Sequence, residues 1–316
     1  MSLVTFRRFA ALALASLLSL MIWNAAQAQT LDAIRDRGHV ICGATDPSPG
    51  FAQQSEDGLW SGFDVDFCRA VAAAVFNDPR RVVFKSYSGT TRLAPLQVGE
   101  VDLLSRNGTW TIRRDSSYNV NFVGVSFFDG QAFMLPQNKD VVSAFELDNV
   151  RVCVLTESEQ VANVRDFFFQ IQATYQEIIY EDRQDLIVAY KAQICDVVSA
   201  PSSWLFAMRK QLDDSAMHRI LPERISKDPM GPVVREGDAE WFEIVRWTLY
   251  VLIAAEELGV NSVNIGSMGE VRTGPIRRFM GLRADFGAPV GPGWLRIENL
   301  RFGRCGVPRH CRCRQR

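Results

Sequence analysis

The sequence is poor in histidine and lacks the short motifs that mark many enzyme families. Its 316 residues include three histidines, His39, His218 and His310, which are too widely separated for a metal-binding or nucleophile–base pattern. It contains no Gly-x-Gly-x-x-Gly, no phosphate-binding Gly-x-x-x-x-Gly-Lys-Ser/Thr, no His-Glu-x-x-His and no Gly-x-Ser-x-Gly. These absences argue against common nucleotide-binding proteins, zinc proteases and serine hydrolases. We therefore expect neither a cofactor nor a bound metal.

The sequence also has no excess of positive charge. Thirty-five Lys and Arg residues are balanced by 36 Asp and Glu residues, which gives a formal net charge of −1. The only basic cluster lies in residues 301–316. A general nucleic-acid-binding protein would show a basic face or strip, so we do not expect nucleic acid to be a partner.

Beyond its first residues, the chain lacks an uninterrupted apolar run that could span a membrane. The most apolar later segment, Trp241 to Ala255, contains Glu243 and Arg246. Near the start, Arg7 and Arg8 precede an apolar run, and Ala26-Gln27-Ala28 gives the small-x-small pattern that signal peptidase cleaves. We predict that residues 1–28 are a removed signal peptide, with a buried N-terminal helix as the alternative. The mature protein is then expected to be soluble and periplasmic.

From Thr30 onward, short helical patterns alternate with short β-branched runs, which is typical of α/β layers with mostly parallel sheets. We expect helices at 31–37, 63–76, 93–97, 158–170, 183–191, 202–211 and 240–258. Strands or extended segments are expected at 39–43, 82–84, 101–104, 122–128, 131–135, 151–155, 178–181, 196–199, 218–221 and 231–234.

This succession fits two lobes with two chain crossings better than one continuous sheet. We assign residues 30–129 to lobe 1, residues 130–229 to lobe 2, and residues 230–294 to a return into lobe 1. Two crossings can act as a pair of hinges, so that the lobes close over a ligand in the cleft between them.

Seven cysteines in an exported chain favour disulfide bonds. Three of them lie in the C-terminal tail, and the other four allow three pairings. Because Cys42 and Cys68 fall in lobe 1 and Cys153 and Cys195 fall in lobe 2, we predict the bridges Cys42–Cys68 and Cys153–Cys195. This choice depends on the lobe assignment.

The segment Ser105–Arg114 has the composition of a carboxylate-binding site. It follows the predicted strand 101–104 with small hydroxyl and amide residues and then opens a helix, whose first backbone N–H groups favour an anion. Arg114, after Thr109, adds a planar donor suited to a carboxylate. The site would lie at the carboxyl end of a sheet strand, where α/β sheets bind ligands. The alternative is a solvated helix start with Arg114 in a surface ion pair.

Four spaced blocks resemble the periplasmic solute-binding proteins of polar amino-acid ABC transporters, and most closely the general L-amino-acid-binding type. The blocks, in order, are Gly62-Phe63-Asp64-Val65-Asp66-Phe67-Cys68, Leu96-Gln97-x-Gly99-Glu100-Val101-Asp102-Leu103-Leu104-Ser105-Arg106-Asn107, Tyr118-x-x-Asn121-Phe122 and Leu221-Pro222-Glu223-x-Ile225-Ser226-Lys227-x-Pro229-x-Gly231-Pro232. The resemblance extends from about residue 30 to about residue 286. It implies a two-lobed periplasmic binding protein fold of type II, each lobe a mixed, mostly parallel sheet flanked by helices.

The resemblance also implies roles for individual residues. Arg114 would grip the α-carboxylate of the ligand, with Thr109 and the backbone around Asn107 completing that pocket. Phe51 would supply an apolar wall near the ligand, with a place in the core as the equal alternative.

In lobe 2 the sequence departs from the family pattern. Thr156-Glu157-Ser158-Glu159 stands where relatives usually have a Gly-Thr-Thr turn, and Pro201 stands where they usually have an Asp that binds the α-ammonium. Proline offers neither charge nor an N–H donor, and a buried ammonium without a partner is costly. Three possibilities follow: Glu159, next to Ser158, replaces the ammonium partner; the ligand lacks an amino group; or binding is lost.

We therefore expect a binding protein, not an enzyme, that delivers an amino acid or related small carboxylate to the membrane permease of an ABC importer, most simply as a monomer. The alternatives are an enzyme on the same fold, similar to a cyclohexadienyl dehydratase, and a binding-impaired divergent copy. Residues 295–316 are rich in Arg and Cys where relatives continue differently. We interpret them as an aberrant, disordered basic tail.

Overall fold

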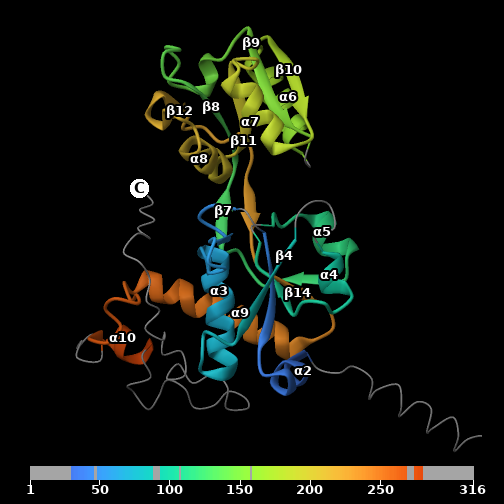
Figure 1. Ribbon diagram of the computed structural model, residues 1–316, viewed down its shortest axis with the longest axis vertical. Helices are drawn as coiled ribbons and strands as arrows, with labels where there is room; N and C mark the ends of the chain where they lie inside the picture. Colours follow the sequence, from blue (N-terminus) through green and yellow to red (C-terminus); the bar gives the residue numbers. More distant parts are fainter. Residues whose placement is uncertain are drawn as a thin grey trace, which may run out of the picture.

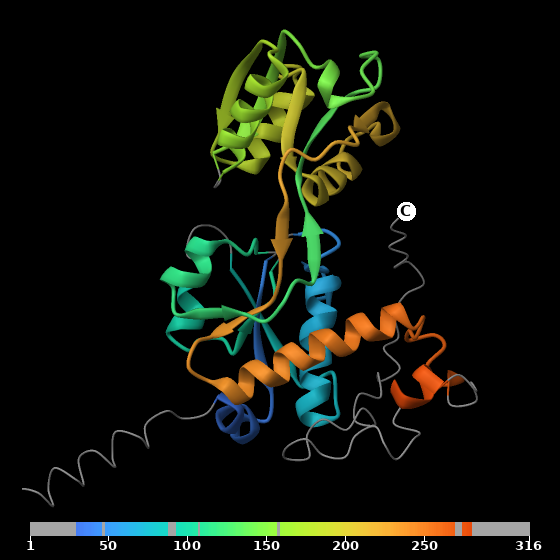
Figure 2. The ribbon, with the colours of Figure 1, turned by 180° about the vertical axis from the view of Figure 1, so that it is seen from behind.

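The computed structural model describes residues 30–45, 48–87, 93–106, 108–156, 159–268 and 274–279. They form two α/β lobes that lie end to end and are joined by two strands (Figures 1 and 2). Strand β7 (Phe127–Asp129) leads from lobe 1 into lobe 2, and β13 (Asp228–Met230) leads back. The predicted two-lobed fold with two crossings is confirmed.

Lobe 1 is built on a mixed sheet with the strand order β4-β1-β5-β14-β6. Strand β1 runs parallel to β4 and β5, whereas the returning β14 is antiparallel to β5 and β6. The strands are β1 (Val40–Ala44), β4 (Val82–Ser86), β5 (Leu103–Leu104), β6 (Val120–Phe122) and β14 (Val233–Arg235). Because β14 inserts between β5 and β6, which precede the first crossing in the chain, lobe 1 is complete only after the second crossing.

Three helices pack on this sheet and enclose its main core: α2 (Thr30–Arg37), α3 (Phe63–Phe76) and α9 (Ala239–Glu257). The predicted apolar stripe of α3 is buried, since Phe67 and Val71 face the core. Asn77 ends α3 in the left-handed conformation, with φ of 55°. Trp241 of α9 is fully buried, and its Nε1 donates to the carbonyl of Asp102 over 2.8 Å. This hydrogen bond joins α9 to the residue that precedes β5.

Lobe 2 repeats the plan with the strand order β10-β9-β11-β8-β12. Here β9 pairs in parallel with β10 and β11, and β8 is antiparallel to β11 and β12. The elements are β8 (Gln131–Pro136), β9 (Val150–Leu155), β10 (Tyr175–Tyr180), β11 (Val197–Pro201), β12 (His218–Ile220), α6 (Gln160–Ile171), α7 (Arg183–Lys191) and α8 (Ser202–Lys210). One core, with α7 and α8, covers one face of the sheet, and a second core, with α6, covers the other.

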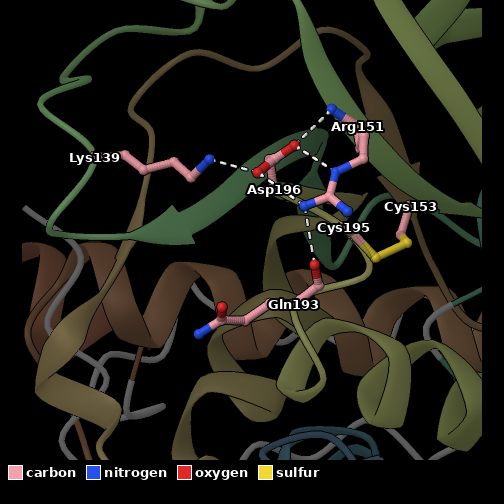
Figure 3. Close-up of polar contacts among 6 residues, drawn as sticks. All are labelled: Lys139, Arg151, Cys153, Gln193, Cys195 and Asp196. Carbon is pink, nitrogen blue, oxygen red and sulfur yellow. Dashed lines mark hydrogen bonds and ion pairs between the residues drawn. A yellow bond between two sulfur atoms is a disulfide. The ribbon is translucent and has the colours of Figure 1, made fainter.

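Among the described residues, each lobe contains one disulfide bond. Cys42–Cys68 links β1 to α3, and Cys153–Cys195 links β9 to the loop that precedes β11. Beside the second disulfide, Asp196 accepts hydrogen bonds from Lys139 and from the backbone and side chain of Arg151 (Figure 3). The Arg151 guanidinium, followed by Lys139, holds the pKa of Asp196 well below its usual range, against the effect of partial burial. This end of lobe 2 is therefore held by a covalent bond and an ionic cluster together.

The hinge strands approach each other closely. Strands β7 and β13 are antiparallel and place Asp129 opposite Asp228. At Gly231 an added Cβ would lie 1.9 Å from the carbonyl oxygen of Gly124, and at Gly130 it would lie 2.5 Å from that of Ser226. Only glycine fits these two positions, so the two crossings are packed backbone to backbone.

The other elements are short: β2 (Gln53–Gln54), β3 (Trp60–Ser61), α4 (Ala94–Gln97), α5 (Ile112–Ser117), η1 (Ala144–Glu146), η2 (Ser215–Met217) and α10 (Gly274–Phe279). The predicted strand 101–104 is shorter than expected, because Asp102 turns its carboxylate onto the Ile41 N–H and the Arg37 guanidinium. None of the described helices combines the length and apolar character of a membrane span. The predicted signal peptide, the tail 295–316, Asn107 and Ser158 lie outside the described residues.

Candidate functional site

Arg114 lies in the first turn of α5 and is held by its own loop. Thr111 is the N-cap residue, and its hydroxyl accepts the backbone N–H of Arg114 over 3.3 Å. The guanidinium folds back so that Nη1 donates to the carbonyl of Thr109 over 2.7 Å. Since α5 spans only six residues, its dipole is weak, and the guanidinium itself is the main attraction for an anion at this point.

A second guanidinium shares the same cavity. A small hollow in lobe 1 is lined by Leu93, Leu104, Arg106, Gly108, Arg114, Phe122, Gly231 and Val233. Arg106 is buried, with 8% of its surface exposed, two residues after the end of strand β5. Arg106 was not among the site residues predicted from the sequence, although a charge so close to the end of a fully buried strand was a usable signal. Arg106 and Arg114 thus bring two guanidinium groups to one hollow of about 20 Å³, and guanidinium is the side-chain group best suited to pair with a carboxylate.

The arginine loop is joined to the hinge by backbone bonds. Thr109 forms an isolated antiparallel bridge with Met230, and the N–H of Trp110 donates to the carbonyl of Pro229 over 2.7 Å. The N–H of Gly231 donates to the carbonyl of Gly108 over 3.4 Å. The predicted carboxylate site therefore lies against β13, and a change in the hinge would be transmitted directly to it.

Phe51 also contacts the hinge. It is buried in an aromatic cluster with Phe63 and Phe127, with ring centroids 6.1 Å and 5.2 Å from its own, both edge to face. Phe127 belongs to β7, and Phe63 keeps 45% of its surface exposed. This packing places Phe51 at the lobe 1 face of the hinge, where the exposed part of the cluster is available as an apolar surface.

On lobe 2, Glu159 stands at the N-cap position of α6 and is exposed. The next residue, Gln160, is buried, and its carbonyl accepts the side-chain amide of Gln131 over 3.0 Å. Gln131 is the first residue of β8 after the hinge, and its amide also donates to Ser199 over 2.9 Å. Glu159 is therefore attached to the end of the lobe 2 sheet that faces the hinge.

Pro201 ends strand β11 at the same edge, paired with Gln131. It precedes α8 without offering a side-chain cap, and Asp129 of β7 takes that role. Asp129 accepts a hydrogen bond from the Ser202 hydroxyl over 2.7 Å and from both the hydroxyl and the N–H of Ser203. The carboxylate of Asp129 is thus fully used in fixing α8 to the hinge.

Asp228, opposite Asp129 on β13, is the carboxylate that the sequence analysis missed. Its Oδ2 accepts the Ser226 hydroxyl over 3.1 Å. Burial raises the pKa of Asp228, and the charges of Asp129 and Glu159 raise it further, while the charge of Arg114 lowers it. Position 228 is left unspecified in the sequence block Lys227-x-Pro229, and only the fold brings the charges of Arg114 and Glu159 close enough to act on Asp228.

A larger cavity lies elsewhere, at the opposite end of the lobe 2 strands. It measures about 460 Å³ and is lined by residues that include Lys139, Arg151, Tyr190, Asp196 and His218. None of the predicted ligand-binding residues lines it. Three or more potential metal ligands are not gathered anywhere within the described part of the chain.

Comparison with known families decides the class of protein. Residues 40–260 match the model of the bacterial extracellular solute-binding proteins, family 3. The chain belongs to this family. This solute-binding protein is 42% identical to the general L-amino acid-binding periplasmic protein AapJ of Rhizobium johnstonii, a match that covers 83% of this chain and 77% of the relative.

Two further relatives agree. The glutamate/glutamine/aspartate/asparagine-binding protein BztA of Rhodobacter capsulatus is 42% identical, with 90% of this chain and 83% of that protein covered. A solved structure of an ABC transporter periplasmic binding protein from Brucella ovis, with glutathione bound, has 39% identity and a TM-score of 0.74, and covers 83% of this chain and 82% of the other. The resemblance found in the sequence is confirmed by these matches.

Proposed function

We propose that this solute-binding protein captures an amino acid or a related small carboxylate and delivers it to the membrane permease of an ABC importer. The observation that carries the proposal is Arg114, held beside the hinge by the Thr109 carbonyl in a cavity that Arg106 shares. Membership of an extracellular solute-binding family, and amino-acid-binding relatives at 42% identity, support the same reading.

In this proposal the lobes bind opposite ends of the ligand. Arg114 forms a charge-assisted pair with the carboxylate, and Thr109 with the backbone near Asn107 completes that pocket. Phe51 and its aromatic neighbours supply the apolar wall, and Ser158 and Glu159 approach from lobe 2. Affinity comes from rotating two preformed lobes over the ligand, so the protein needs no cofactor and performs no chemistry.

The remaining sequence predictions complete the proposal. The protein would act in the periplasm as a monomer after removal of residues 1–28, with its permease as the macromolecular partner and without nucleic acid. The lobe limits after residues 129 and 229, and the return segment 230–294, stay predictions.

A thermal-shift screen tests the proposed function. The exported protein is heated with each of the twenty amino acids, with glutathione and with simple mono- and dicarboxylates. A true ligand at 100 times its Kd stabilises the folded state by about 2.7 kcal/mol, which raises Tm by several degrees. Stabilisation that rises with the concentration of an amino acid or carboxylate supports the proposal. If every compound leaves Tm unchanged up to millimolar concentration, the proposal is wrong.

A further inference from the structure

Pro201 stands where relatives usually have the Asp that binds the ligand ammonium, and the nearby hinge carboxylate of Asp129 already accepts other hydrogen bonds. Pro201 has no charge, and Asp129 is committed to the serines at the start of α8. An ammonium group enclosed between the lobes would need another carboxylate, because burying an uncompensated charge costs several kcal/mol. Such a carboxylate must have acceptor positions that no protein donor already fills.

Asp228 has that capacity. It lies on the crossing strand β13, half-buried, and Ser226 donates to its Oδ2. Within the described residues no group donates a hydrogen bond to its Oδ1. A carboxylate has about four acceptor positions, so most of those on Asp228 remain for a ligand.

The charges around Asp228 come from both lobes and from the hinge. Asp129 on β7 and Glu159 before α6 repel its negative form, while Arg114 on α5 attracts it. Glu159 precedes α6 of lobe 2 and Arg114 belongs to α5 of lobe 1, so the charges that act on Asp228 come from both sides of the hinge. One guanidinium can pair with the carboxylate of an amino acid, and a nearby carboxylate can pair with its ammonium, so the charges here are complementary to a zwitterion.

A second observation comes from an uncharged group. Gln160 has only 8% of its surface exposed, yet its Oε1 has no hydrogen-bond partner among the described residues. Gln160 follows Glu159 in sequence and bonds through its carbonyl to Gln131, the first residue of lobe 2 after the hinge. A buried acceptor without a donor is costly, and an ammonium group offers three donors.

We propose that Asp228, aided by Glu159 and the Gln160 amide oxygen, forms the subsite for the ammonium group of the ligand. This inference rests on the proposed function and narrows it: the ligand class is the α-amino acids and their derivatives with a free amino group, not plain carboxylates. The hinge strand takes over the role that Pro201 cannot perform, and lobe closure brings Glu159 to the same group.

Calorimetry with two matched ligands tests the proposal. The probes are L-glutamine and its des-amino analogue, glutaramate, which differ only in the α-ammonium group. For the Asp228→Asn variant we expect L-glutamine binding to weaken about 10- to 100-fold, the range for losing a charge-assisted bond, with glutaramate binding unchanged. Asp185→Asn, the same chemical change on the exposed face of α7, is the control and should alter neither. An unchanged preference for L-glutamine in Asp228→Asn would overturn the proposal.

The pH dependence gives a second measurement that needs no variant. A ligand ammonium beside Asp228 favours its carboxylate form and so lowers its raised pKa, so L-glutamine binding must release protons at acidic pH and weaken as the pH falls. Calorimetry in two buffers of different ionisation heat measures this release, and glutaramate should show a smaller one. Equal proton release for both ligands would count against Asp228.

The proposed function can fail separately. If Arg114→Ala retains the affinity of the wild type for both probes, the carboxylate anchor is wrong whatever Asp228 does. If wild-type protein binds glutaramate as tightly as L-glutamine, the carboxylate site stands and the ammonium subsite is refuted. If wild-type protein binds neither amino acids nor simple carboxylates, both are refuted.

Discussion

At Arg114, a charge suited to a carboxylate is fixed by contacts within a few residues of chain. Its backbone N–H is capped by Thr111, and its guanidinium donates to the Thr109 carbonyl. Arg113, the preceding residue, has the same chemistry but is exposed. The difference between the two is direction, because one faces the cavity shared with Arg106 and the other faces solvent.

We predict that Arg114→Ala weakens ligand binding by about 100-fold or more, equivalent to about 3 kcal/mol, because it removes the charge-assisted pair with the carboxylate. Isothermal titration with the ligand found by the screen measures the change. Arg113→Ala, on the same helix turn, is the matched control and should bind as the wild type does. Equal losses in the two variants would point to general electrostatic attraction instead of a specific anchor.

At the scale of single elements, lobe 2 is held together at both ends of its strands by buried or half-buried carboxylates. At the hinge end Asp129 caps α8, and at the far end Asp196 joins the start of β11 to Arg151 of β9 and to Lys139. The Cys153–Cys195 disulfide lies beside the Asp196 cluster (Figure 3). The far end should therefore respond to pH without affecting the ligand site.

We predict that Asp196→Asn lowers Tm by about 2–4 °C at neutral pH, because an amide replaces a carboxylate that accepts bonds from two cations. The folded pKa of Asp196 is depressed, so its contribution is present above its unfolded pKa of about 3.9 and is lost as the pH falls below that value. The difference in Tm between variant and wild type should therefore shrink on acidification. A difference that stays constant from neutral to acid pH would exclude this role.

On the scale of the whole molecule, the paired strands β7 and β13 join the two lobes (Figure 1). Gly231 sits where β13 returns to lobe 1, against the carbonyl of Gly124, and it also lines the cavity of Arg114. Packing at the hinge and geometry at the site are therefore coupled through one backbone contact.

We predict that Gly231→Ala destabilises the protein by about 1–3 kcal/mol, because its Cβ would lie 1.9 Å from a backbone oxygen that has no side-chain freedom to move aside. Ligand affinity should fall as well, since the arginine loop bonds to the same strand. Gly266→Ala, where an added Cβ meets nothing within 4 Å, is the control for both measurements. Denaturant unfolding and calorimetry report the two effects, and a fully stable Gly231→Ala would show that the crossings are not tightly packed.

Much of the fold could be predicted from the sequence because periodicity and turn residues are local signals. The apolar stripe of α3 and the β-branched runs of β1 and β9 gave those elements nearly at their observed limits. Strand β10 was expected at 178–181 and spans Tyr175–Tyr180. Its first residues are held in the strand by hydrogen bonds to β9, and their own sequence has no β-branched pattern that would predict this. Edge contacts of this kind are invisible along the chain.

The sequence alone determined the family to which the blocks of motifs point, and it predicted Arg114 as a carboxylate anchor and Pro201 as the position that lacks the usual ammonium-binding Asp. Those features depend on residue type at a fixed spacing. Only the tertiary structure decided that Arg106 shares the cavity, that Asp129 caps α8, and that the charges of Arg114 and Glu159 act on Asp228. Residues 114, 159 and 228 come together because two crossings fold distant segments to one joint, and charges interact through space, not along the chain.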